Sequence, residues 1–371
     1  MRGHLLVFLA LALSACMRPD VQRPAVYGAE VTAERARLAE QAVRFQDAEA
    51  RRLTAIAWPI MTANAELCPR RTHMPGFRLT SHHEYSRELR GAAREHLDVE
   101  HRPRLQMVVA QSPAEAAGLR AGDRVEAIDS RATGPRARDW RRSLHHLERS
   151  ARDGLVRLTI RRDGALMEYE IELRPACSYA IEIQRSPVVN AFADGERIVI
   201  LEGLIDFALN DEEIAFILAH ELAHNVERHV QASQWNALAG GAAGLLIDVA
   251  LASAGLNTGA VFAEAGMRVG AEAYSPEFEA EADYLSLYYL ARAGIPLDGV
   301  EAFWRRMADR HPEGVTRTTT HPSYPERTVN IIATRQEIEA KIAAGEPLIP
   351  ERRKSNFDRN RSDEHRALDG G

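Results

Sequence analysis

The stretch Ile217-Leu-Ala-His-Glu-Leu-Ala-His-Asn225 decides how this chain is interpreted. It places His220, Glu221 and His224 inside an apolar run with the spacing of a helix. Residues four apart lie on one face of a helix, so the two imidazoles project together. Such a pair suits one tetrahedral Zn²⁺, and Glu221 beside it suits a general base acting on water. The competing interpretation is a core helix with satisfied histidines, but an unpaired buried carboxylate is costly.

A catalytic zinc needs a third protein ligand and one open position. His229 follows His224 by five residues, and Val230 occupies the position where metzincins require histidine, so the spacing excludes that class. The remaining option is a glutamate from a later helix.

Such a helix is predicted between a capping serine at 275 and a terminating glycine at 294. Glu279 and Asp283 are four apart on it and therefore share a face. Glu279 can complete the metal site, while Asp283 can accept the ring N–H of a ligating histidine and fix its tautomer.

The two motifs together, HELAH at 220–224 and SPEFEAEAD at 275–283, resemble those of the HtpX/BepA/Oma-type gluzincin metallopeptidases, which are related to the CAAX prenyl endopeptidases. NAFADG at 190–195 and THPSYPER at 320–327 also fit this family, and the resemblance covers residues 30–68 and 178–345. It implies one zinc ion per chain and a peptidase activity. The site residues that it implies are the ligands His220, His224 and Glu279, the base Glu221, His321 near the oxyanion, and Asp283 and Arg327 in support.

Residues 103–175 form a second candidate domain. The run SPAEAAGLRAGDRV at 112–125 predicts a short helix, a glycine turn and a strand, and a hairpin is predicted around Asp163-Gly164. This pattern resembles the PDZ domains of bacterial periplasmic proteases. Such domains bind an extended peptide at a sheet edge beside a helix. The alternative is a small α+β insertion without a ligand.

The first residues have the pattern of a secretory signal. A basic start and a short apolar run are followed by Leu13-Ser-Ala-Cys16, which resembles a bacterial lipobox. The resemblance implies cleavage before Cys16, lipidation of its thiol and a periplasmic protein held at the outer membrane. Cys68 and Cys177 then remain, and an even number in an oxidising compartment favours a disulfide over two unrelated thiols.

Three further expectations concern surfaces. Residues 237–255 are apolar and rich in glycine, and we expect a helical hairpin over the active-site cleft rather than ordinary core or a membrane-spanning helix. Substrate is expected to pair in extended form with an edge strand at 197–201. Four histidines without a carboxylate partner are expected at the surface: His82, His83, His145 and His146.

The fold class expected is α+β, a mostly helical zincin-type domain with a small sheet plus a PDZ-like module. The boundaries expected are a signal peptide at 1–15, a tether at 16–28, an N-terminal helix packing on the catalytic domain at 29–68 and interrupted by Pro59, the PDZ-like domain at 103–175, the peptidase domain at 178–345 and a disordered tail at 346–371.

The net charge is −6 and no stretch is strongly basic, so we expect no nucleic acid as a partner. We therefore expect a zinc endopeptidase that acts on proteins or peptides of the envelope in quality control. A chaperone or scaffold that binds outer-membrane protein intermediates through the PDZ-like domain is the alternative. A purely structural zinc would need a fourth protein ligand, and none is evident.

Overall fold

The computed structural model describes residues 27–254, 256, 258–272, 275–310 and 324–352. The signal sequence, Cys16 and His321 lie outside the described residues. The helices are α2 (Gly28–Ala63), η1 (Ala65–Leu67), η2 (His82–Glu84), α3 (Arg90–Leu97), α4 (Pro113–Ala116), α5 (Ala137–Asp153), α6 (Glu202–Phe207), α7 (Asp211–Val226), α8 (His229–Ser253), α9 (Val261–Glu272), α10 (Ser275–Arg292), α11 (Val300–Arg310) and α13 (Tyr324–Ala344). The strands are β1 (Arg71–Met74), β2 (Phe77–Thr80), β3 (Arg104–Val108), β4 (Arg124–Ile128), β5 (Arg131–Ala132), β6 (Leu155–Arg162), β7 (Ala165–Glu172), β8 (Arg174–Cys177), β9 (Ala180–Gln184), β10 (Ala191–Ala193) and β11 (Arg197–Leu201).

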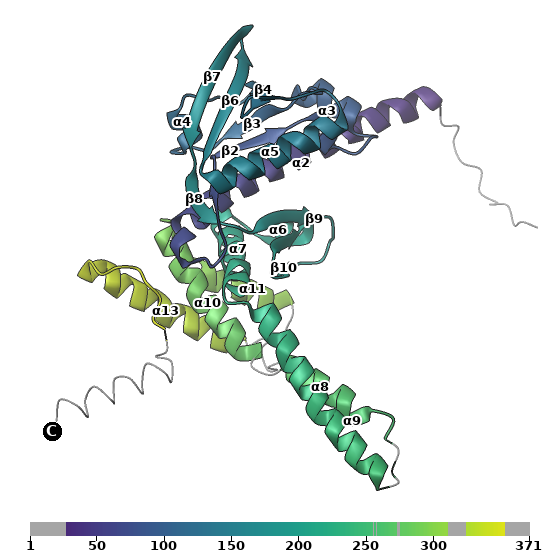
Figure 1. Cartoon of the computed structure of the whole chain (residues 1–371), viewed down its shortest axis with the longest axis vertical. Helices are drawn as coiled ribbons and strands as arrows, with labels where there is room; N and C mark the ends of the chain where they lie inside the picture. Colours follow the sequence, from purple (N-terminus) through teal and green to yellow (C-terminus); the bar gives the residue numbers. More distant parts are fainter. Residues whose placement is uncertain (1–26, 255, 257, 273–274, 311–323, 353–371) are drawn as a thin grey trace, which may run out of the picture.

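The chain folds as α+β, as the sequence predicts. One module is a six-stranded sheet in the order β2-β3-β4-β6-β7, with β5 paired to β4, and α5 lies against it. The other is a bundle of α7, α10, α11 and α13 beside a three-stranded sheet. Figure 1 shows the sheet module at the top and the bundle in the middle. Each module has its own apolar core.

Helix α2 bridges the two modules. Its first half packs Val43 against α3, where Ala93 and Val99 complete a small apolar cluster. Its last turns bury Ile60 and Met61 in the core of the bundle. The predicted interruption at Pro59 is wrong, because the helix continues to Ala63. Proline removes one intrahelical hydrogen bond, and burial of the two apolar side chains that follow compensates for that loss.

The PDZ-like sheet extends further toward the N-terminus than residue 103, because β2 pairs antiparallel with β3. The histidine- and arginine-rich sequence around β2 hides this strand from pattern analysis. The hairpin of β6 and β7 turns at Asp163 and Gly164, both with positive φ, which is the backbone that this turn demands.

The small sheet beside the bundle has the order β10-β11-β9. The predicted substrate edge at residues 197–201 is therefore wrong, since β11 is the central strand and its apolar residues are buried on both sides. Among the described residues the edges of this sheet are β9 and β10. Of these, β10 packs against α7.

Helix α7 is stabilised by hydrogen bonds at its N-terminus and by burial of its apolar side chains. Asn210 accepts a hydrogen bond from the backbone N–H of Glu213 at 3.0 Å, and the Glu213 carboxylate accepts one from the N–H of Leu209 at 2.9 Å. These bonds satisfy two backbone donors near the helix start. Almost every residue of α7 is buried, which explains why apolar residues lie on all its faces.

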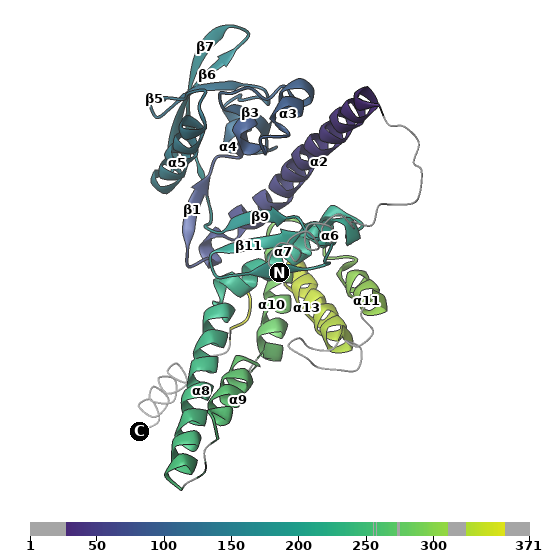
Figure 2. The ribbon, with the colours of Figure 1, turned by 90° about the vertical axis from the view of Figure 1, so that its right-hand side faces the viewer.

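Helices α8 and α9 pack together as a hairpin that projects away from both modules (Figures 1 and 2). The expected cover over the cleft is therefore wrong, although the expected helical hairpin is present. The start of the expected disordered tail also differs: Arg352 donates to both carboxylate oxygens of Glu227 at 2.7 and 2.8 Å. This pairing holds the chain after α13 against the end of α7.

The structure joins Cys68 and Cys177 in a disulfide with a Cα–Cα distance of 5.5 Å and a sequence separation of 109. Both cysteines are buried in the core of the bundle. The bridge closes a loop that contains the whole PDZ-like module, and it ties the end of α2 to β8.

Replacing both bridge cysteines by serine is expected to lower the free energy of unfolding by about 2–4 kcal/mol, because the bridge restricts a long loop in the unfolded chain. Thermal unfolding with and without dithiothreitol measures this. The double variant is the control, and its melting temperature should not respond to the reductant. The prediction is contradicted if the melting temperature of the wild-type protein is also unchanged by the reductant.

Candidate metal centre

Three predicted ligands converge from two helices. His220 and His224 project from α7, and Glu279 projects from α10, which packs along α7. The two Nε2 atoms are 3.1 Å apart. Oε2 of Glu279 lies 3.4 Å from Nε2 of His220, and Oε1 lies 3.4 Å from Nε2 of His224.

This donor set fits a zinc ion. Ligand bonds of 2.0–2.1 Å in a tetrahedral site place neighbouring donors about 3.3 Å apart, close to the spacing observed. Two imidazoles and one carboxylate are also the ligand types of catalytic zinc sites that keep an open position.

Asp283 fixes the orientation of the first histidine. Its Oδ1 lies 3.0 Å from Nδ1 of His220, so the ring proton belongs on Nδ1 and the Nε2 lone pair faces the ligand cluster. Arg327 of α13 holds the other side of the same carboxylate through two hydrogen bonds, of 2.7 and 2.8 Å. The guanidinium lies 3.6 Å from the centre of the Trp304 ring. All four side chains are buried.

The charges around the cluster favour a cation. Burial alone would lower the pKa of His220, but its bonds to Asp283 and Glu279 raise that pKa to about 10. Burial, reinforced by His220, lowers the pKa of His224 to about 3. The buried carboxylates of Glu279 and Asp283 thus favour a positive charge at His220, which a bound proton would provide. A metal ion held by the two histidines and Glu279 would provide that positive charge instead.

Glu221 occupies the buried position expected of a base. Burial raises the pKa of its carboxyl, while His220, Arg327 and the backbone N–H of Ala193 act against that shift. The contact with Ala193 places the carboxylate beside β10, at the edge of the small sheet. Glu221 therefore lies between the ligand cluster and the strand edge.

His229 makes a contact with the cluster that the sequence pattern does not predict. Its Nδ1 lies 3.0 Å from Nδ1 of His224, and its Nε2 lies 3.3 Å from Oε2 of Glu281. The ring stacks on Phe278 at 4.6 Å. Arg228 has positive φ and bends the chain between α7 and α8, which turns His229 back toward the cluster. Only this bend, which spacing along one helix does not reveal, brings the residue into place.

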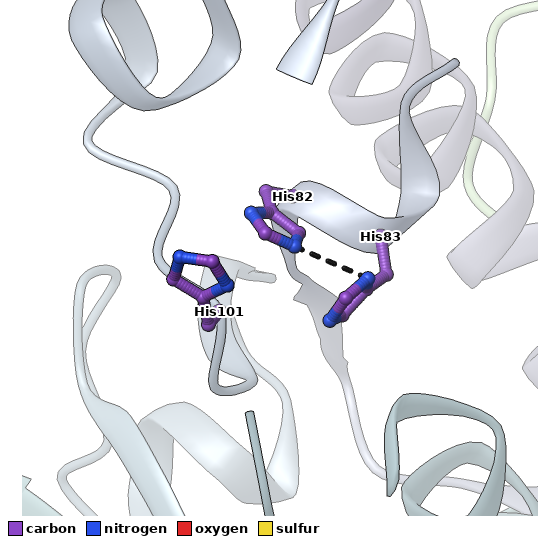
Figure 3. Close-up of side chains that lie close together, drawn as sticks. All are labelled: His82, His83 and His101. Carbon is purple, nitrogen blue, oxygen red and sulfur yellow. Dashed lines mark hydrogen bonds between the residues drawn. The ribbon is translucent and has the colours of Figure 1, made fainter. Parts of the chain in front are cut away.

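A second histidine cluster lies at the edge of the PDZ-like module. Figure 3 shows the rings of His82, His83 and His101 together, with 3.1 Å between Nε2 of His82 and Nδ1 of His83. The expectation that His82 lies at the surface is wrong, because it is 6% exposed. Burial, the other two imidazoles, Arg90 and Arg94 lower its pKa to about 4. The same positive surroundings oppose a metal cation here, in contrast to the carboxylates around His220.

Comparisons with known proteins agree with this geometry. Residues 163–335 match the model of Peptidase family M48, and residues 107–162 match that of a PDZ domain. Residues 163–335 are therefore similar to M48 metallopeptidases. The M48 match contains α7, α10 and the first part of α13, and so it contains the residues that converge at the candidate metal centre.

Several curated relatives are similar to part of the chain. Mitochondrial metalloendopeptidase OMA1 of Schizosaccharomyces pombe is 27% identical over 153 residues, 40% of this chain and 44% of the relative. A Vibrio cholerae protein described as a beta-barrel assembly-enhancing protease is 33% identical over 132 residues, 33% of this chain and 27% of the relative. OMA1 of Saccharomyces cerevisiae is 29% identical over 151 residues, 38% of this chain and 42% of the relative. The chain thus spans less than half the length of each of these relatives.

Replacing Arg327 by methionine is expected to lower the free energy of unfolding by about 3–5 kcal/mol, because Asp283 loses its buried partner. Chemical denaturation measures this. The matched control is Arg37→Met, which removes an exposed partner of Glu34 and should leave stability unchanged. Equal effects of the two substitutions contradict the role given to Arg327.

Proposed function

We propose that the chain is a zinc-dependent endopeptidase that hydrolyses peptide bonds of envelope proteins. The observation that carries the proposal is the convergence of His220, His224 and Glu279, whose donor atoms are 3.1–3.4 Å apart, next to the buried carboxylate of Glu221. The match to Peptidase family M48 over the same segment supports it.

In this proposal His220, His224 and Glu279 hold Zn²⁺. When bound, the ion acts as a Lewis acid that polarises a carbonyl and favours deprotonation of water. The Glu221 carboxylate accepts a proton from a water molecule as the water oxygen attacks the peptide carbonyl carbon. Glu221 then delivers that proton to the amide nitrogen, the C–N bond breaks, and a carboxyl group and an amine result. His321 is proposed to donate to the developing oxyanion.

The substrate strand is proposed to pair with β10. This strand is an edge among the described residues, packs against α7, and brings the backbone of Ala193 to Glu221. An extended chain added at this edge presents its backbone carbonyls along the ligand cluster, as in other cases of strand addition. The exposed ring of Phe192 on β10 would contact a substrate side chain.

The proposed place of action is the periplasm, with the lipidated Cys16 at the outer membrane and a role in protein quality control. Support comes from the lipobox-like start, from the PDZ match and from the name of the Vibrio cholerae relative, which refers to beta-barrel assembly. The Cys68–Cys177 disulfide is also typical of proteins that fold outside the cytoplasm.

A chaperone or scaffold is the second candidate. The specific observation in its favour is the separate PDZ-like module, whose edge strand β2 and own apolar core allow peptide binding without the peptidase site. In that case cleavage would be incidental to binding.

Replacing Glu221 by glutamine is expected to reduce cleavage of an unfolded protein such as casein by about 10²–10⁴-fold, since general base catalysis contributes that much. Zinc content should stay unchanged, because Glu221 is not a ligand in this proposal. The matched control is Glu148→Gln on α5, whose side chain is 71% exposed, and it should cleave at the wild-type rate.

Undiminished cleavage by the Glu221→Gln variant contradicts the proposed mechanism. If the variant loses cleavage yet restores envelope integrity in cells that lack the protein, the scaffold candidate replaces the endopeptidase as the principal function.

A further inference from the structure

The hairpin of α8 and α9 has its apolar residues on the outside. On α8 the buried residues are His229, Gly241, Gly244 and Asp248, and none of them is a large apolar side chain. Most of the large apolar side chains of the hairpin are instead between 39% and 72% exposed. They are Trp235, Leu238, Leu245, Leu246, Ile247, Val249, Leu256, Val261, Phe262, Met267 and Val269.

Small residues fill the contact between the two helices. A Cβ atom on Gly244 would lie 1.9 Å from the backbone oxygen of Phe262, and one on Gly266 would lie 2.1 Å from the backbone oxygen of Gly240. The helices therefore approach through glycine backbones and leave their large side chains pointing outward. Close packing through glycine is common between helices in lipid, where burying large apolar side chains between helices brings no gain.

Charge is almost absent from the hairpin. Between residues 230 and 263 the sequence carries one charged residue, Asp248. Its carboxylate accepts hydrogen bonds from the backbone N–H of Ala263 at 2.8 Å and of Phe262 at 3.3 Å, and from the hydroxyl of Thr258. Asp248 belongs to α8, but its carboxylate lies at the N-terminal end of α9, where a negative charge is favourable. All of these hydrogen bonds are made within the hairpin.

Lipid fits this surface better than a protein partner. Successive helix residues are about 100° apart, so Leu245, Leu246 and Ile247 point in three different directions. Near the tip the exposed apolar side chains thus point in several directions away from α9, whereas a docked protein would cover one side of the hairpin. We propose that the tip of the α8–α9 hairpin inserts into the acyl-chain layer of a membrane.

The insertion is limited to one leaflet. Because Gly266 lies against Gly240 and Phe262 against Gly244, the exposed Glu264 is level with residue 242 of α8. From there to the end of α8 the hairpin extends about 17 Å, close to half of a hydrocarbon core roughly 30 Å thick. Glu264 and the exposed Arg268 then remain among the lipid headgroups. Helix α8 alone is long and apolar enough to span a membrane, but the hairpin in this arrangement enters only one leaflet.

The hairpin begins beside the candidate metal centre. His229 at the base of α8 contacts His224. Insertion therefore holds the metal centre within the length of one helix, about 37 Å, of the bilayer. The consequence for catalysis rests on the proposed function, whereas the insertion itself does not.

A fluorescent probe at the tip tests the insertion. Leu246→Cys is made in the full chain together with Cys16→Ser, so that the other two cysteines are held in the Cys68–Cys177 disulfide and only residue 246 takes the NBD label. Vesicles of phosphatidylcholine and phosphatidylglycerol are then added. The emission is expected to shift to shorter wavelength, and acyl-chain nitroxide lipids are expected to quench it. The same label at Leu166→Cys, an exposed position on β7, is the control and should show neither effect.

A second variant guards against a response caused by the label. Val249→Asp, at a position 59% exposed, should abolish the quenching of the label at residue 246, whereas Met167→Asp on β7 should leave it intact. A label at 246 that stays in water when vesicles are added overturns the proposal. So does a spectral shift that needs protein concentration rather than lipid, because a second copy of the chain would then cover the hairpin. Casein cleavage is not part of the readout, so failure here is distinct from failure of the proposed function.

Discussion

The carboxylate of Asp283 lies between two hydrogen-bond donors that come from different helices. It accepts from the guanidinium of Arg327 on α13 and lies 3.0 Å from the imidazole of His220 on α7, while its own backbone belongs to α10. Three helices are thus joined at one buried charge. Because the group is 1% exposed, the arrangement requires that all its partners be present. The ring orientation of His220, and with it the geometry of the ligand cluster, follows from this contact.

The rest of the bundle supplies the conditions that this contact needs. The cap at Asn210 fixes the start of α7, and the bend at Arg228 fixes its end and returns His229 to His224. Helix α2 and the Cys68–Cys177 bridge hold the bundle to the PDZ-like module. The hairpin differs from the bundle in what covers its apolar residues. Both α7 and α8 carry apolar residues on all their faces, but those of α7 are buried in protein, whereas most of those of α8 are exposed. The proposed membrane insertion would cover the apolar residues of α8.

The sequence predicts which residues of each helix lie together at the candidate metal centre, because the spacing within one helix is local. Two histidines four apart must share a face of α7, and Glu279 and Asp283 must share one of α10. The α+β class and the elements of the PDZ-like module followed from periodicity and turn residues in the same way. Contacts that depend on tertiary structure were not accessible: the burial of His82, the central position of β11 and the direction of the hairpin all depend on how elements meet. The helix through Pro59 shows the same limit, since packing outweighs a local preference there.

Metal content tests the central claim most directly. Elemental analysis of the purified chain should find one zinc ion per molecule, and Glu279→Ala should lose most of it while circular dichroism shows that the fold is retained. The matched control Glu277→Ala, two residues earlier on α10, should keep the ion. A wild-type protein without a transition metal, or a Glu279→Ala variant that retains its full zinc content, would contradict the account.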